Sequence, residues 1–228
     1  MSTIVSNELV ARAIPRIRAL AGSGEEAPLA VRIFEVAVAA TALVIFAPLI
    51  AITALIIRRG TPGPLLFFQE RLGQGGRPFR FVKFRTLYAD ARERFPELYA
   101  YRYTPEQIEA LRFKVEDDPR VTPQGKWLRR TTLDELPNFW NVLTGDMALV
   151  GPRPEMPEML PYYYGEMLRK FTVRPGVTGL AQISGRGRLS FRKTVELDVE
   201  YVRRHSFLFD LRIILRTLKL ILTRDGAF

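Results

Sequence analysis

The stretch from Val36 to Ile57 reads VAVAATALVIFAPLIAITALII and contains 22 residues without a charged side chain. About 20 apolar residues suffice for a helix to span the hydrocarbon core of a bilayer. The stretch begins too far along the chain for a simple signal peptide, and no small-residue cleavage site follows it. It therefore predicts a helix that resides in a membrane.

Pro48 lies in the middle of this stretch, where it removes one backbone hydrogen bond and clashes with the preceding turn. Basic residues flank the stretch on both sides, so the positive-inside rule favours neither orientation. They are Arg12, Arg16, Arg18 and Arg32 before it, and Arg58, Arg59, Arg71 and Arg77 after it. We expect a re-entrant helix over residues 31–59, broken at Pro48, that enters and leaves on one face. A single crossing is the alternative.

The end of the chain carries a second membrane signal. Residues 208–222 read LFDLRIILRTLKLIL, with apolar side chains at helical spacing and Arg212, Arg216 and Lys219 on the opposite face. Such a basic amphipathic helix suits an anionic membrane surface, and packing on the protein's own core is an equal alternative. We expect an N-terminal arm at residues 1–30, a cytosolic catalytic domain at 60–207, and the amphipathic helix and tail at 208–228.

Residues 60–207 predict an α/β, mainly helical domain with a small sheet. RPFRFVKFRTL alternates as a strand does, with Phe79, Phe81, Lys83 and Arg85 on one face. We expect a helix over residues 89–100. Another should start at Thr104, with Pro105 at its first position and Gln107 completing a capping box.

Composition limits the function. The 228 residues carry a net charge of +10 and are 47% hydrophobic, so the chain is not disordered by composition. There is no cysteine and one histidine, which excludes disulfides, thiolate metal sites and multi-histidine metal sites. The basic balance favours an anionic partner, such as nucleic acid, anionic lipid or a phosphorylated substrate.

TTLDELPNFW, residues 131–140, places two carboxylates side by side, Asp134 and Glu135. A capping box between Thr132 and Glu135 is the local explanation. Pro137 instead favours a helix that starts at the proline, with both acids at its N-terminal end. Adjacent carboxylates repel, so a cation should accompany them. Mg²⁺ uses one or two carboxylates plus substrate phosphates, and an aspartate can carry a phosphoryl group covalently. Taken alone, an Asp–Glu pair most often lies exposed on the surface and has no specific function.

Two basic loops accompany the acids. Gly151, Pro152 and Pro154 make a stiff loop around Arg153, which can bind phosphate bidentately. RPGVTGLAQISGRGR, residues 174–188, combines glycine turns with arginines, a combination that suits anions. It contains no Walker pattern and no GxGxxG, so these motifs do not identify the ligand.

Four ordered blocks resemble the bacterial sugar transferases, and in particular the small monotopic phosphoglycosyl transferases. The blocks are FQERLGQGGRPFRFVKFRTL, DDPRVTPQGKWLRRTTLDELPNFWNVLTGDMALVGPRPE, RPGVTGLAQISGRGR and VELDVEYV. The resemblance runs from about residue 31 to residue 228. It implies that a sugar-1-phosphate moves from a UDP-sugar to a membrane polyprenyl phosphate, with release of UMP.

The resemblance also implies roles for residues. Asp134 matches the family nucleophile that carries the phosphosugar, and Glu135 matches the residue that helps to hold Mg²⁺. Five basic residues match positions that contact phosphates: Lys83, Arg85, Arg129, Arg153 and Arg186. Asp198 matches a family acid, and its role stays open. Family members often have serine before the helix-breaking proline, whereas this chain has Ala47.

These implications place the protein on the cytoplasmic face of the bacterial inner membrane, in contact with its inner leaflet, and without a nucleic-acid partner. A basic nucleic-acid-binding protein or a non-catalytic membrane scaffold is the alternative. The transferred sugar, the pathway and the oligomeric state, a homo-oligomer included, are open.

Overall fold

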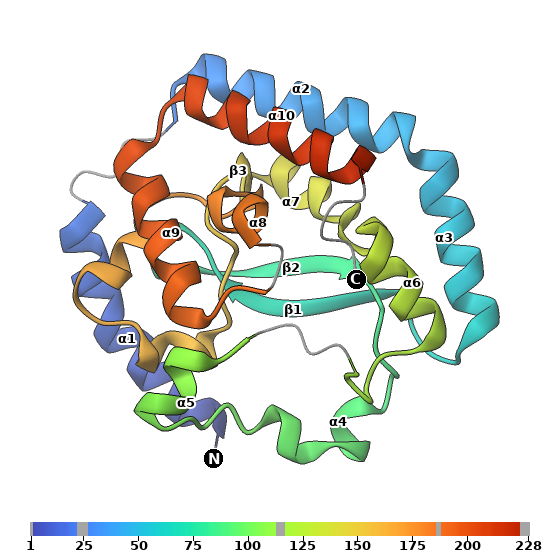
Figure 1. Ribbon diagram of the computed structural model, residues 1–228, viewed down its shortest axis with the longest axis horizontal. Coiled ribbons are helices and arrows are strands. Elements are labelled where there is room, and N and C mark those ends of the chain that lie inside the picture. The colour runs from blue at the N-terminus through green and yellow to red at the C-terminus, as the bar shows by residue number, and fades with distance from the viewer. Residues whose placement is uncertain (1, 22–26, 113–116, 186–187, 224–228) are drawn as a thin grey trace.

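The computed structural model describes residues 2–21, 27–112, 117–185 and 188–223. Helices surround two small sheets (Figure 1). Strand β1 (Leu66–Leu72) pairs antiparallel with β2 (Pro78–Phe84), and β3 (Ala148–Val150) pairs parallel with β4 (Gly176–Thr178). The expected mainly helical domain with a small sheet is confirmed.

The long apolar stretch forms two helices with a bend between them. Helix α2 (Leu29–Ile45) and helix α3 (Ala47–Gly60) meet at an angle of 59°. Pro48 lies in the first turn of α3, where a missing N–H is tolerated, and it cannot donate to the carbonyl of Val44. Among the described residues no single helix is long and apolar enough to cross a membrane, but the bent pair together is. The predicted break at Pro48 is confirmed.

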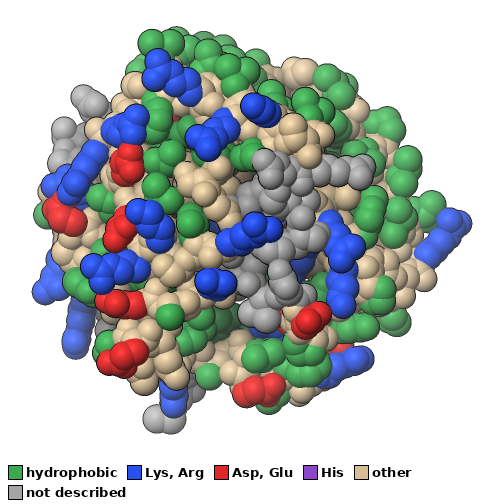
Figure 2. All heavy atoms as spheres, in the orientation of Figure 1, with side chains coloured by type: hydrophobic (Ala, Val, Ile, Leu, Met, Phe, Trp, Pro, Cys, Tyr) green, Lys and Arg blue, Asp and Glu red, His purple; other side chains and the backbone are tan. Residues whose placement is uncertain are grey.

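Helix α2 is tied to the rest of the molecule through charged residues. Glu35 is buried and lies 2.7 Å from the Arg174 guanidinium, and Arg32 donates to the carbonyl of Leu143 at 2.9 Å. Most apolar side chains of α2 and α3 point outward instead, and Leu29 and Val44 are each about three-quarters exposed. Hydrophobic side chains accordingly gather along the edge of the molecule formed by α2 and α3 (Figure 2).

Helix α10 (Phe207–Thr223) runs beside α2 (Figure 1), with the rings of Phe34 and Phe207 5.7 Å apart. Ile213 is buried in the core, whereas Leu208, Leu215 and Leu222 are exposed. The expected C-terminal amphipathic helix is therefore present. One line of its apolar side chains packs on the domain, and another faces outward next to α2.

The strand predicted over residues 77–87 is confirmed for Pro78–Phe84, which form β2, and the last three predicted residues lie beyond its end. Its partner β1 was not predicted from the sequence, and it pairs in a register that puts Phe67 opposite Lys83. Helix α7 (Asn138–Thr144) fastens this hairpin, because Asn141 accepts from the Val82 N–H and donates to the Arg80 carbonyl. Two phenylalanines of β2 are buried in different parts of the core: Phe81 packs near Val142 of α7, and Phe84 packs near Ile57 and Leu128.

Of the two helices predicted for residues 89–110, one is wrong and one is confirmed. The helix expected over residues 89–100 is wrong: α4 (Ala91–Arg94) ends before Pro96, and a 3₁₀ turn, η2 (Pro96–Tyr99), follows. Proline cannot continue a helix, and the residue before it is pushed out of the helical region. Helix α5 (Pro105–Ala110) has the predicted capping box between Thr104 and Gln107.

The expected N-terminal arm contains helix α1 (Ser2–Ala21), which packs on the domain. Ile17 is fully buried against three short 3₁₀ segments and their neighbours. These segments are η1 (Gln74–Gly76), η4 (Pro157–Tyr162) and η5 (Gly165–Thr172). The remaining helices are α6 (Pro123–Thr131), α8 (Leu180–Gly185) and α9 (Phe191–Arg204).

Candidate active site

Asp134 and Glu135 lie in a short 3₁₀ turn, η3 (Leu133–Glu135), between α6 and α7. The chain reverses at Thr132, whose φ of 61° lies in the left-handed region that non-glycine residues rarely adopt. Pro137 caps α7, which starts at Asn138, so the predicted helix that opens at Pro137 is confirmed. The alternative capping box is wrong, because the Thr132 side chain makes no capping hydrogen bond.

Three cations surround this acidic pair, and we call the five residues the front cluster. They are Lys83, Arg129, Asp134, Glu135 and Arg153. Asp134 is only 7% exposed, and among the described residues no hydrogen bond or ion pair holds its carboxylate. Glu135 contacts Arg153, with 2.8 Å between Oε1 and Nη1. The sheet, α6 and the loop after β3 each contribute one cation.

Burial and neighbouring charges shift the pKa values of this cluster. Burial, together with the Glu135 charge, raises the pKa of Asp134 to about 6, against the opposing effect of Lys83, Arg153 and Arg129. Burial lowers the pKa of Lys83 to about 8; Asp134 opposes this, and the nearby arginines add to it. At neutral pH Asp134 is therefore mainly a carboxylate, but a more basic and more nucleophilic one than an ordinary aspartate.

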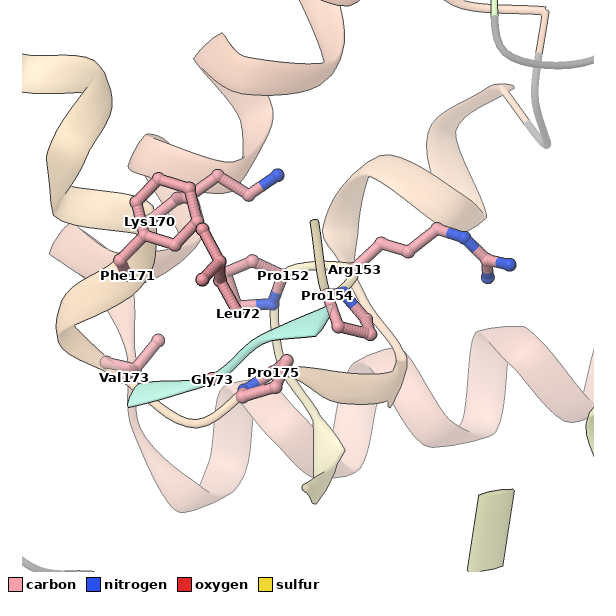
Figure 3. A pocket seen from close by; sticks show the side chains of 9 residues that line it. All are labelled: Leu72, Gly73, Pro152, Arg153, Pro154, Lys170, Phe171, Val173 and Pro175. Carbon is pink, nitrogen blue, oxygen red and sulfur yellow. The ribbon is translucent and has the colours of Figure 1, made fainter. Parts of the chain in front are cut away.

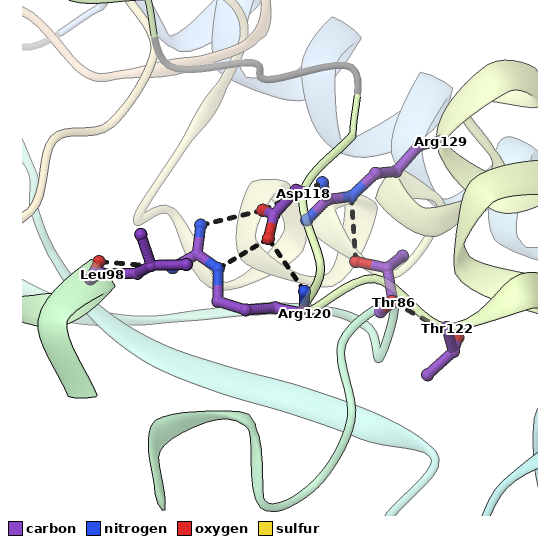
Figure 4. Close-up of polar contacts among 6 residues, drawn as sticks. All are labelled: Thr86, Leu98, Asp118, Arg120, Thr122 and Arg129. Atoms are coloured by element: carbon purple, nitrogen blue, oxygen red, sulfur yellow. Dashed lines mark hydrogen bonds and ion pairs between the residues drawn. The ribbon is translucent and has the colours of Figure 1, made fainter. Parts of the chain in front are cut away.

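Arg129 is held in place by residues that the sequence did not single out (Figure 4). Its Nε donates to Thr86 Oγ1 at 3.2 Å, and its guanidinium lies 3.8 Å from Asp118. Asp118 also accepts two hydrogen bonds from the Arg120 side chain at 2.8 Å. Burial raises the pKa of Asp118, but the hydrogen bonds from Arg120 outweigh this and lower it. The DDPR motif was part of the resemblance, but nothing local indicated this contact.

The loop that carries Arg153 is pinned on both sides of the arginine. The Gly176 N–H donates to the Pro152 carbonyl at 2.9 Å, and Arg71 donates to the Pro154 carbonyl at 3.2 Å. Gly151 passes so close to the Arg174 carbonyl that a Cβ atom would lie 2.4 Å from it. Arg153 points away from a cavity of about 10 Å³ behind the loop (Figure 3), too small for more than one water. The Arg153 guanidinium therefore lies on the Glu135 side of the loop.

A second group of polar residues lies behind this loop, and we call it the rear cluster. It consists of Glu155, Tyr163, Lys170 and Asp198, all of them buried. Lys170 Nζ lies 3.1 Å from Asp198 Oδ2 and 3.4 Å from Glu155 Oε2. The Tyr163 hydroxyl donates to Glu155 Oε2 at 2.6 Å. Glu155 and Lys170 were not candidates from the sequence.

The remaining predicted site residues lie elsewhere. Arg85 does not join the front cluster: it is 4% exposed and donates to the carbonyls of Thr61 and Pro64. The reason is that β2 ends at Phe84, so strand alternation no longer sets its direction. Asp198 belongs to the rear cluster, 1% exposed. Arg186 lies outside the described residues.

Comparison with known proteins identifies the family. The family description "bacterial sugar transferase" matches residues 27–224. The chain belongs to the bacterial sugar transferase family. This family match covers the front cluster, the rear cluster and helices α2, α3 and α10, and it begins after α1.

Three relatives show the range of this family. The galactosyl transferase CpsE of Streptococcus agalactiae is 46% identical over 72% of this chain and 36% of its own length. The UDP-glucose:undecaprenyl-phosphate glucose-1-phosphate transferase of Caulobacter vibrioides is 40% identical over 86% of this chain and 71% of its own. The exopolysaccharide production protein ExoY of Rhizobium meliloti is 35% identical over 88% of both chains. The chain spans only 36–42% of the length of several such relatives.

Proposed function

We propose that this protein transfers a sugar-1-phosphate from a UDP-sugar to a membrane polyprenyl phosphate and releases UMP. The observation that carries the proposal is the front cluster, in which three cations surround a buried carboxylate. The name of the Caulobacter relative, a UDP-glucose:undecaprenyl-phosphate glucose-1-phosphate transferase, supports the choice of substrates. The reaction would start an exopolysaccharide, O-antigen or glycoprotein glycan on its lipid carrier.

In the proposed first step, an Asp134 oxygen attacks the phosphorus that bears the sugar. A bond forms between that oxygen and phosphorus, the bridging phosphorus–oxygen bond breaks, and UMP leaves with the electron pair. Two negatively charged partners meet in this step, so the positive side chains of Lys83, Arg129 and Arg153 must offset their repulsion. The Asp134 carboxylate is suited to attack because its raised pKa makes it more basic.

In the second step a phosphate oxygen of the polyprenyl phosphate attacks the same phosphorus. The aspartyl–phosphorus bond breaks, the Asp134 carboxylate is regenerated, and a diphosphate links the lipid to the sugar. The same cations serve both steps, since each places a phosphate beside Asp134. Arg129, held by Thr86 and Asp118, keeps a fixed position for this task.

Mg²⁺ fits this site in one specific mode. The described residues contain no group of three or more carboxylate or imidazole ligands that could enclose a metal by themselves. Two adjacent carboxylates fit the usual Mg²⁺ arrangement of one or two acids completed by substrate phosphates and water. We assign Glu135 as the metal-holding residue. When bound, the ion supplies positive charge to the reacting phosphates. Arg153 holds Glu135 in place for this role.

We further propose that the bent α2–α3 pair enters the cytoplasmic leaflet and returns, with α10 lying at the surface beside it. The outward-facing apolar residues of all three helices support this, since so large an exposed patch is costly in water. Cysteines introduced at Ser6 and Ser190 test it in sealed spheroplasts with an impermeant maleimide. Both should be labelled only after lysis. Labelling of Ser6→Cys alone before lysis would show a crossing, and Pro48→Leu should favour that outcome.

The decisive experiment for the function combines purified protein, Mg²⁺, polyprenyl phosphate and a panel of UDP-sugars, with UMP release as the readout. Donor and Mg²⁺ without lipid should release up to one UMP per active site and add the mass of one sugar phosphate to the peptide that contains Asp134. The absence of UMP until lipid is added would support direct attack by the lipid instead. The absence of UMP with every sugar and lipid present would reject the transferase.

A further inference from the structure

The rear cluster has no part in the proposed reaction, yet it lies directly behind the loop that presents Arg153. Glu155 is 6% exposed, Lys170 4% and Asp198 1%. Buried charges are costly unless they are paired, so each of these residues depends on the others. Lys170 is the central member, because it contacts Glu155, Asp198 and the Tyr163 hydroxyl.

Arg153 lies near two glutamates. It contacts Glu135 at 2.8 Å, and Glu155, two residues further along the loop, is close enough to help Glu135 raise the pKa of Arg153. The Glu155 carboxylate is already occupied, because Tyr163 donates to it and Lys170 lies beside it. Arg71 also lies beside Glu155, but its two Nη atoms donate to the Pro154 carbonyl and to Gln69. Without Lys170 the charge of Glu155 would therefore be only partly balanced, and it would draw Arg153 away from Glu135. Glu155 is the more buried of the two, and attraction between charges grows as water is excluded.

From this geometry we propose that Lys170 is a positioning residue for the transfer reaction. By neutralising Glu155, it keeps Arg153 paired with Glu135, on the side of the loop where the substrate phosphates would bind. The proposal rests on the proposed function, and it assigns the rear cluster the task of setting which glutamate Arg153 contacts.

The loop backbone is anchored, so the direction of the Arg153 side chain decides which glutamate it contacts. The loop is fixed at Pro152 and Pro154, and the Leu72 N–H donates to the Glu155 carbonyl at 2.8 Å. Arg153 can therefore change partner only by rotating its side chain. Asp198 shares Lys170 but comes from α9, so it balances charge without competing for the loop arginine.

The test uses three variants: Lys170→Gln, Lys170→Gln/Glu155→Gln and Lys170→Gln/Asp198→Asn. The two double variants have the same net charge and each lacks one buried carboxylate. The readout is the rate of UMP release in a single turnover with a UDP-sugar and Mg²⁺, per titrated active site. We expect Lys170→Gln to be about 10²-fold slower, the scale of a misplaced catalytic contact. Removing Glu155 should restore most of that loss, whereas removing Asp198 should not.

Equal rates for the two double variants would overturn the proposal, because a purely structural role for Lys170 predicts that removal of either acid relieves the same charge imbalance. A wild-type rate for Lys170→Gln would overturn it too. Thermal unfolding accompanies each rate. If Lys170→Gln does not fold, the two double variants decide, and failure of Lys170→Gln/Glu155→Gln to regain activity counts against the proposal. Wild-type protein that releases no UMP would instead reject the proposed function.

Discussion

The front and rear clusters lie on opposite sides of the loop that carries Arg153 (GPRP, residues 151–154), and they differ in charge balance. The front cluster has three cations and two carboxylates, with Arg153 43% exposed on its side chain. The rear cluster has Lys170 against Glu155 and Asp198, with Arg71 next to Glu155 as a second cation. An excess of cations that faces solvent is suited to bind an anionic substrate, whereas a buried set whose charges are balanced has no charge left to bind one. The balance of charge therefore separates two otherwise similar groups.

The largest effect should come from Asp134→Asn. The amide keeps the shape of the side chain but cannot act as the attacking carboxylate, so turnover should fall by about 10⁴-fold or more, as when other nucleophiles are removed. Intact-protein mass after incubation with donor and Mg²⁺ checks this, since the adduct should vanish. Asp90→Asn, on the exposed start of α4, is the matched control and should keep the adduct. An adduct on the Asp134→Asn protein would place the nucleophile elsewhere.

The rear cluster should respond in stability. Lys170→Gln leaves two carboxylates without their buried partner, and breaking a buried pair costs about 3–5 kcal/mol. Arg153→Gln in the front cluster removes a half-exposed ion pair, which contributes about 0–1 kcal/mol. Urea unfolding of both variants at neutral pH measures the difference. Similar losses for the two would remove the distinction between the clusters.

Glu135→Gln should slow the reaction by about 10²-fold, because it weakens the hold on Mg²⁺ and releases Arg153 from its partner. The rate should be measured over a range of Mg²⁺ concentrations, and binding of Mn²⁺ in place of Mg²⁺ gives a readout that does not depend on turnover. Glu97→Gln, on the exposed η2 turn, is the control for loss of one negative charge. Normal turnover of Glu135→Gln at limiting Mg²⁺ would contradict a metal-holding role.

The smallest effect is expected in the pH dependence of adduct formation at the front cluster. Asp134 must be ionised to attack, so adduct formation should rise about tenfold per pH unit up to the pKa of about 6 and then level off. It should fall above the Lys83 pKa of about 8, where that side chain loses its charge. These values describe interacting groups and belong to the cluster as a whole. A profile without a change near pH 6 would contradict the role of Asp134.

Asp198 provides the control for that profile, because burial raises its pKa to about 6 as well. The folded protein therefore holds an extra proton on Asp198 between the ordinary value of 3.8 and about 6. The contribution of Asp198 to the free energy of unfolding is therefore present at low pH and is lost as the pH rises through 6. Asp198→Asn should remove this part of the pH dependence of unfolding and leave the acid limb of the rate in place.

Local signals in the sequence determined much of this protein. Pro48 predicted the break between α2 and α3, Pro137 predicted the start of α7, and Thr104 with Gln107 predicted the cap of α5. Each depends on backbone chemistry within a few residues, so it can be read without the fold. Alternation in RPFRFVKF likewise predicted β2, and the LDELP and GPRP motifs identified residues that the fold brings together as Glu135 and Arg153.

Only the tertiary structure decided which charged residues meet. Asp118 reaches Arg129, and Lys170 reaches both Glu155 and Asp198, across separations that carry no periodic signal. Lys83 and Arg85 shared one predicted face, but the end of β2 leaves Lys83 beside Asp134 and sends Arg85 to the turn at Thr61. The sequence alone does not show which charged side chains meet, because the fold brings them together and excludes water around them. Burial and distance, which arise only from the fold, set the strength of each pairing.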